Sequence, residues 1–62
     1  MNSMQRTELL GELVAIDAKM VEATSRATNT TNDFTFEKII QEVRRLRRER
    51  AEVKAKLDAL PN

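Results

Sequence analysis

The chain has 62 residues, which is enough for one small domain and no more. It contains no cysteine and no histidine, which excludes a disulfide scaffold and leaves oxygen atoms as the available metal ligands. Eleven basic residues nearly balance ten acidic ones, and the net charge of +1 gives no overall attraction to nucleic acid or to a membrane.

The composition is typical of long helices, with 34% charged residues, one glycine and one proline. A domain of about 60 residues buries only about 60% of the surface that its unfolded chain exposes. Such chains usually need a disulfide, a metal or a partner chain to be stable. We therefore expect association between copies of this chain.

The first predicted element is a helix over residues 4–25. Its apolar residues alternate spacings of four and three: Leu9, Leu13, Ile16, Met20, Ala23 and Ala27. Leu10, Val14 and Val21 widen this stripe beyond a strict two-position seam. Gly11 costs a helix about 1 kcal/mol relative to alanine, and it is either tolerated or allows a neighbouring helix to approach closely.

A polar loop is predicted over residues 26–34. Six of the eight residues from 26 to 33 are Thr, Asn or Asp, whose side chains compete for backbone hydrogen bonds and favour turns. The length suits a connection between neighbouring antiparallel helices. The alternative, a single long helix through this segment, is disfavoured by the low helix propensity of Thr and Asn.

The second predicted helix covers residues 35–60. Thr35 is the expected N-cap and Asp33 the competing one. With Thr35 as the cap, Phe34 could pack on Ile39 as a hydrophobic staple. Pro61 should end the helix, because the residue before a proline avoids helical backbone angles.

The second helix carries more than three heptads of alternating spacing: Phe36, Ile39, Val43, Leu46, Arg50, Val53, Leu57 and Leu60. Arg50 is the polar intruder, and it can extend its head to solvent, pair with Glu12 or fix the register of packing.

Folding the two helices together predicts four apolar contacts: Leu9 with Val53, Ile16 with Leu46, Met20 with Val43, and Ala23 with Ile39. The same register predicts ion pairs between Lys19 and Glu42 and between Glu12 and Arg50. Two helices cover only part of their apolar faces, so the expected fold is an antiparallel hairpin that assembles as a homodimeric four-helix bundle or coiled coil. The alternatives are association through the second helices alone and docking mainly on a different protein.

The residues expected to contact a second copy or another partner are Leu10, Val14, Val21, Phe36, Ile40, Val43, Leu46, Val53 and Leu57.

The sequence offers little for catalysis. It has no Cys, His, Tyr or Trp and no glycine-rich phosphate loop, so we expect no catalytic residues, no cofactor and no bound metal. No apolar run approaches the length of a membrane span or a signal-peptide core, which predicts a cytoplasmic protein without membrane contact. The leading hypothesis is a structural, adaptor or regulatory module that binds another protein.

A cluster of arginines from Arg44 to Arg50 supports a second hypothesis, a small regulatory bundle that binds RNA or DNA. The candidate phosphate contacts are Arg44, Arg45, Arg47 and Arg48. The competing interpretation is a solvated helix face with intrahelical ion pairs such as Arg45 with Glu49. No aromatic residue is interleaved for base stacking.

The predicted architecture is similar to two kinds of small protein. One is the Rop-type plasmid copy-number regulators, helical hairpins that dimerise and bind paired RNA loops. The other is the small phage head–tail joining proteins, in which two helices flank a short turn. The second resemblance implies a third hypothesis, a phage or mobile-element assembly protein. Both are likenesses of architecture, and no site residue is carried over from either.

Overall fold

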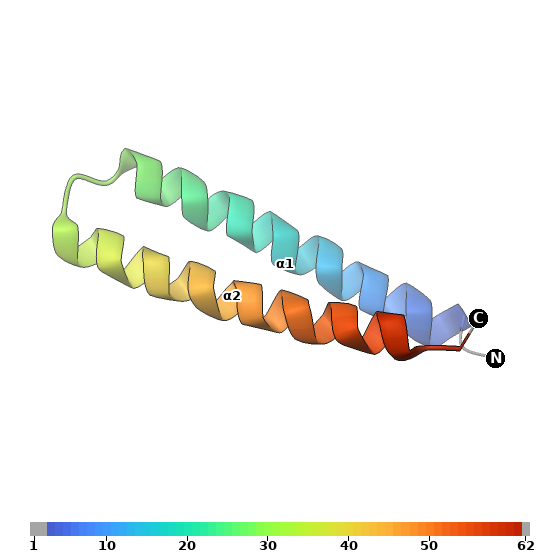
Figure 1. Cartoon of the computed structure of the whole chain (residues 1–62). Coiled ribbons are helices and arrows are strands. Elements are labelled where there is room, and N and C mark those ends of the chain that lie inside the picture. The colour runs from blue at the N-terminus through green and yellow to red at the C-terminus, as the bar shows by residue number, and fades with distance from the viewer. Residues whose placement is uncertain (1–2, 62) are drawn as a thin grey trace.

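The computed structural model describes residues 3–61, with side chains from Met4 onward. It contains two helices, α1 (Ser3–Asn29) and α2 (Asp33–Ala59), which are joined by residues 30–32. The helices lie side by side and antiparallel, so the start of α1 is next to the end of α2 (Figure 1). The predicted pair of packed helices is therefore confirmed.

One line of apolar side chains holds the two helices together. The buried residues are Leu9, Ala23, Ile39, Leu46 and Val53. They belong to the two stripes of spacing three and four, and the other members of the four predicted contacts, Ile16, Met20 and Val43, are half-buried. We call this line the seam. The fully buried Ala23 shows that the backbones approach closely near the connected end.

The connection is shorter than the predicted loop of residues 26–34, because α1 continues to Asn29 and α2 begins at Asp33. Two threonines in the last turns of α1 bond to carbonyls of the helix itself, and one of them, Thr28, belongs to the segment that was assigned to the loop. Thr24 donates to the carbonyl of Met20 at 2.8 Å, and Thr28 donates to the carbonyl of Thr24 at 3.0 Å. These hydroxyls bond within the helix, so they do not compete with it for backbone groups.

Asn32 is the N-cap of α2, and the prediction of Thr35 or Asp33 in this role was wrong. The Asn32 side-chain oxygen accepts a hydrogen bond from the Thr35 amide at 3.0 Å. The Asn32 carbonyl accepts the first helical bond, from the amide of Phe36 at 2.9 Å. The cap thus lies three residues earlier than expected, and Asp33 instead places a carboxylate in the first turn, where it is favoured.

The earlier cap also removes the predicted hydrophobic staple between Phe34 and Ile39. Phe34 now lies in the first turn of α2 and is 69% exposed. Its ring lies under the ammonium group of Lys38, with the nitrogen 4.7 Å from the ring centroid. This cation–π contact is exposed and contributes on the order of 0.5–1 kcal/mol.

The second helix ends as the proline predicts. Leu60 has an extended backbone (φ −70°, ψ 136°), and its amide donates to the Leu57 carbonyl at 3.2 Å. Helical angles at this position would bring the residue into conflict with the ring of Pro61.

The hairpin is a rod rather than a compact body. Its extents are 49 × 14 × 10 Å and its radius of gyration is 14.6 Å, against about 11 Å for a compact chain of this length. Its accessible surface is 5095 Å², whereas a compact monomer of this mass exposes about 4,100 Å². The single hairpin therefore leaves roughly 1,000 Å² more surface in water than a compact fold would.

Candidate interaction surface

Two ion pairs join the helices, one on each side of the seam. The Arg50 guanidinium donates through Nε to Asp17 Oδ1 at 2.8 Å. The Arg26 guanidinium donates through Nη2 to Glu42 Oε2, also at 2.8 Å. Asp17 and Arg26 are nine residues apart, which places them about 180° from each other around α1. We call the two faces of the hairpin the Asp17 side and the Arg26 side.

The predicted ion pairs of Lys19 with Glu42 and of Glu12 with Arg50 were wrong. The prediction paired residues at equal height along the rod. Helical side chains, however, lean toward the N-terminus of their own helix. In an antiparallel pair this lean brings together residues whose backbones are offset, so Arg50 meets Asp17 instead of Glu12.

The Asp17 side of α1 is apolar. Leu10, Val14 and Val21 lie within about 60° of Asp17 around the helix, and they are 49%, 70% and 70% exposed. A shallow groove runs along the same side between Asp17 and Thr28, with Val21 in its wall. Three branched aliphatic side chains in water on one helix face form an apolar strip with nothing packed on it in the single hairpin.

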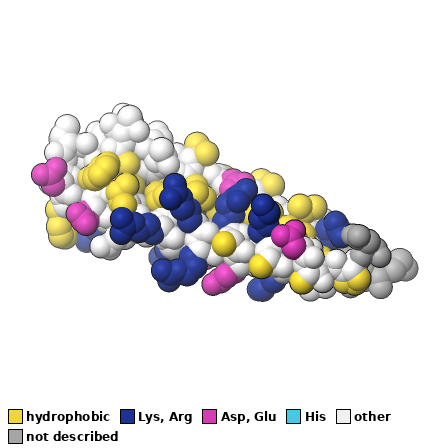
Figure 2. Space-filling model, viewed as in Figure 1, with side chains coloured by type: hydrophobic (Ala, Val, Ile, Leu, Met, Phe, Trp, Pro, Cys, Tyr) yellow, Lys and Arg dark blue, Asp and Glu magenta, His cyan; other side chains and the backbone are white. Residues whose placement is uncertain are grey.

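The Asp17 side of α2 mixes apolar and basic residues. Phe36 is exposed, whereas Ile40 and Val43 are half-buried. All three lie within about 80° of Arg50, and Arg47 lies in the same sector. In Figure 2, hydrophobic side chains lie at intervals along the pair, with lysines and arginines gathered around its middle. The Asp17 side of α2 therefore has apolar side chains that another chain could bury and basic side chains that would then need acidic partners.

The nine residues predicted to touch another chain divide into two groups. Leu10, Val14, Val21 and Phe36 are exposed, and Ile40 and Val43 are half-buried, all on the Asp17 side. The remaining three belong to the seam: Leu46 and Val53 are buried there, and Leu57 is half-buried near the end of α2. The first six are free to contact a second chain, whereas Leu46 and Val53 already pack inside the hairpin.

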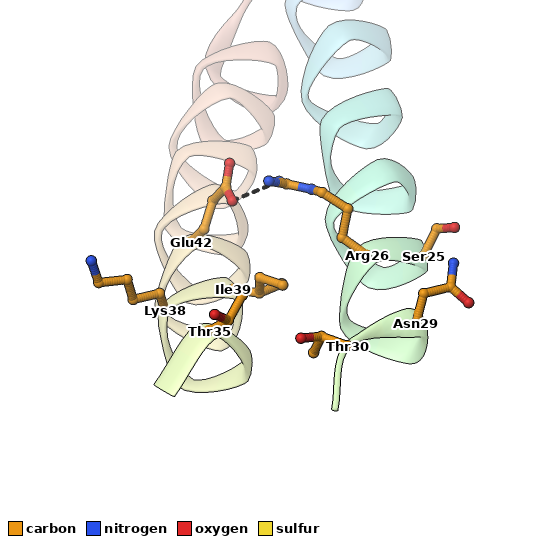
Figure 3. A pocket seen from close by; sticks show the side chains of 8 residues that line it. All are labelled: Ser25, Arg26, Asn29, Thr30, Thr35, Lys38, Ile39 and Glu42. Carbon is orange, nitrogen blue, oxygen red and sulfur yellow. Dashed lines mark hydrogen bonds and ion pairs between the residues drawn. The ribbon is translucent and has the colours of Figure 1, made fainter. Parts of the chain in front are cut away.

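The Arg26 side is charged, and it has an open depression near the connection. The Arg26–Glu42 ion pair crosses from α1 to α2 beside this depression (Figure 3). Residues of mostly polar type line it: Ser25, Arg26, Asn29, Thr30, Thr35, Lys38, Ile39 and Glu42. Sequence reasoning missed the ion pair because it assigned Arg26 to the loop. The signal was present, since Arg26 continues the helical face of Lys19 and Glu22.

The arginines predicted as a phosphate-binding face are all exposed, but they do not share one face. Arg45 and Arg47 point about 160° apart around α2, while Arg44 and Arg48 point outward between them. Arg45 makes an intrahelical ion pair with Glu49, 4.0 Å away. The four guanidinium groups therefore wrap around the middle of α2, and Arg47 alone belongs to the Asp17 side.

Within the described part of the chain, no three acidic side chains come together as a metal site. Neither described helix is long and apolar enough to cross a membrane. Comparisons of the chain with protein-family models, with curated proteins and with solved structures found no match.

Proposed function

We propose that this chain is a non-enzymatic interaction module, structural, adaptor or regulatory, that works as a homodimeric bundle of four helices and docks on another protein. The observation that carries the proposal is the uncovered apolar strip of the Asp17 side, formed by Leu10, Val14 and Val21 on α1 with Phe36 on α2. A helix with one charged and one apolar exposed sector stabilises a protein when the apolar sector is covered.

The magnitudes support association. Burying one large aliphatic or aromatic side chain is worth about 1.5–3 kcal/mol. Four such side chains are exposed on this side, and copies of them lie on each hairpin of a dimer. The surface in excess of a compact fold, roughly 1,000 Å², is close to the ~800 Å² that one partner contributes to an interface of standard size.

The acidic side chains and the shape of the surface support binding to another chain rather than catalysis. The acidic residues lie on exposed helix surfaces, apart from Glu42, which is half-buried and paired with Arg26. Catalysis by carboxylates needs a water-excluding pocket that holds a substrate against them. The depressions on this rod are open grooves along helix surfaces, which suit contact with another chain.

Sedimentation equilibrium tests the proposal with one variant and one matched control. The wild-type chain is expected to have the mass of a dimer at micromolar concentration. Val21→Glu adds a charge to the apolar strip and should shift the protein to monomer. Ala15→Glu adds the same charge to α1 on the Arg26 side and should leave the dimer intact. A folded wild-type monomer would overturn the proposal.

A second candidate function is nucleic-acid binding, and the outward position of Arg44 and Arg48 favours it. These residues lie four apart on an exposed face, so both can reach one phosphate backbone. Titration with mixed RNA and DNA at two salt concentrations tests it. Replacing Arg44 and Arg48 with glutamine should reduce the salt slope by about one unit per lost phosphate contact. Absence of binding at low salt rejects this candidate.

A further inference from the structure

We infer that a second copy covers the Asp17 side with its connection at the same end of the bundle, so that α1 of each hairpin lies on α2 of the other. This inference rests on the proposed homodimer and adds the orientation of its subunits. Two observations carry it: the distribution of charge between the helices, and the positions of the charged residues on the Asp17 side.

Two-fold symmetry allows two ways of stacking the hairpins face to face along parallel axes. If the axis is parallel to the helices, both connections lie at one end and α1 rests on the second copy's α2. If the axis is perpendicular to the helices, the connections lie at opposite ends. Each helix then rests on the equivalent helix of the second hairpin, α1 on α1 and α2 on α2.

The helices differ in charge. The α1 helix (Ser3–Asn29) carries three basic and four acidic side chains, a net of −1, whereas α2 (Asp33–Ala59) carries eight basic and six acidic side chains, a net of +2. Same-end stacking places helices of opposite net charge together. Opposite-end stacking places two basic helices against each other, with Arg47 of each copy close to Arg47 of the other. Like charges across an interface disfavour association, so the charges select the same-end arrangement.

Individual positions agree with this choice. The connection is centred on residue 31, so a residue of α1 and a residue of α2 lie at the same height when their numbers add up to 62. Because side chains lean toward the N-terminus of their own helix, the tips of an α1 and an α2 side chain meet when the sum is about 62–68. The same sums apply between α1 of one copy and α2 of the other in the same-end dimer. In the same-end dimer, Asp17 then faces Arg47 of the second copy, and Arg6 faces Asp58. In the opposite-end dimer, Asp17 faces Asp17 and Arg47 faces Arg47.

The apolar residues match in the same register. Val21 meets Val43 of the second copy, and Val14 meets Ala51, which lies on the same side of α2. The contact therefore continues the seam, with one aliphatic layer on each side of the Asp17–Arg47 pair. Asp17 bridges two arginines, Arg50 within its own hairpin at 2.8 Å and Arg47 across the interface.

A single spin-labelled position measures the orientation directly. The chain has no native cysteine, so Thr31→Cys in the exposed connection can be labelled alone and the label-to-label distance measured by pulsed electron resonance. The same-end dimer should give a distance below about 25 Å. An opposite-end dimer should give about 40 Å or more, because helices of this length span about 40 Å. A long distance in a protein of dimeric mass overturns the orientation and leaves the homodimer standing. A monomeric mass overturns both.

An independent test is whether reversing one charge raises or lowers the dissociation constant of the dimer. Arg47→Glu should raise the dimer dissociation constant about tenfold in the same-end dimer, because two symmetry-related contacts with Asp17 become repulsive. In an opposite-end dimer the same change would relieve repulsion between arginines and lower that constant. Arg48→Glu is the matched control, since it makes the same change in net charge on an outward position and should leave the constant within about twofold. Tighter association of Arg47→Glu than of Arg48→Glu overturns the orientation.

Discussion

Asp17 and Arg50 meet across the seam at 2.8 Å, although Arg50 occupies a heptad position that hydrophobic residues hold elsewhere in α2. The guanidinium lies at the edge of the seam on the apolar side and reaches a carboxylate on the other helix. This arrangement satisfies a charge that would otherwise be left unpaired beside a hydrophobic strip. It also links the contact inside the hairpin to the surface that a second copy would cover.

Removing this ion pair should have a small effect on stability. Both side chains are about half exposed, and exposed pairs contribute about 0.2–1 kcal/mol. Asp17→Ala should therefore lower the free energy of unfolding by about 0.2–1 kcal/mol for each ion pair that it removes, measured by urea denaturation at fixed protein concentration. Glu12→Ala is the control, because Glu12 was predicted to pair with Arg50 and does not. An equal loss in both variants would contradict the observed pairing.

Replacing the N-cap should cost more. Asn32→Ala leaves the Thr35 amide without its side-chain acceptor and should destabilise the protein by about 1 kcal/mol. Asn32→Asp keeps an oxygen at that position and should retain most of the stability. Urea denaturation followed by circular dichroism measures both. If Thr35→Ala were the more damaging change, the cap would have been assigned to the wrong residue.

Enlarging Ala23 should force the helices apart. This side chain has no exposed surface, and inserting larger groups into a well-packed contact typically costs about 1–3 kcal/mol. Ala23→Leu should show this loss in thermal unfolding. Ala15→Leu makes the same substitution at an exposed position of α1 and should change stability by less than about 0.5 kcal/mol. Equal stabilities for the two variants would mean that the backbones do not approach closely at Ala23.

Gly11 offers a substitution expected to stabilise the chain. Apart from the nearby backbone of its own helix, a methyl group added there meets no atom within 4 Å, and alanine is favoured over glycine in a helix interior by about 1 kcal/mol. Gly11→Ala should raise the free energy of unfolding by about that amount, with an unchanged sedimentation profile. Weaker self-association of this variant would instead assign Gly11 to a close approach between copies.

The seam can be predicted from the sequence because many apolar residues at helical spacing all indicate the same buried face. Leu9, Ile39 and Leu46 follow a helical period that no single substitution obscures, and all three are buried. The end of α2 was predicted for a similar reason, since Pro61 restricts Leu60 on steric grounds alone. Strong local rules and long repeats can therefore be read from one sequence.

The connection and the ion pairs depend on weaker differences. Asn32, Asp33 and Thr35 can all cap a helix, and the choice among them changes the free energy by only a few tenths of a kcal/mol. Thr28 before them was assigned to the loop, but its hydroxyl bonds back within α1 to the carbonyl of Thr24. Predicting the ion pairs requires knowing that helical side chains lean toward the N-terminus of their own helix. The spacing of residues along the sequence does not contain this information. The contact with another chain stays a prediction, because a single hairpin contains no second chain.

The most direct test of the central claim is the dependence of unfolding on protein concentration. If the hairpin is stable mainly because copies associate, each tenfold rise in concentration should add about 1.4 kcal/mol to the stability of the dimer. Over a roughly hundredfold range, the urea midpoint should then rise by on the order of 1–2 M. A midpoint that stays constant over this range would show that the lone hairpin is stable by itself and would contradict the account.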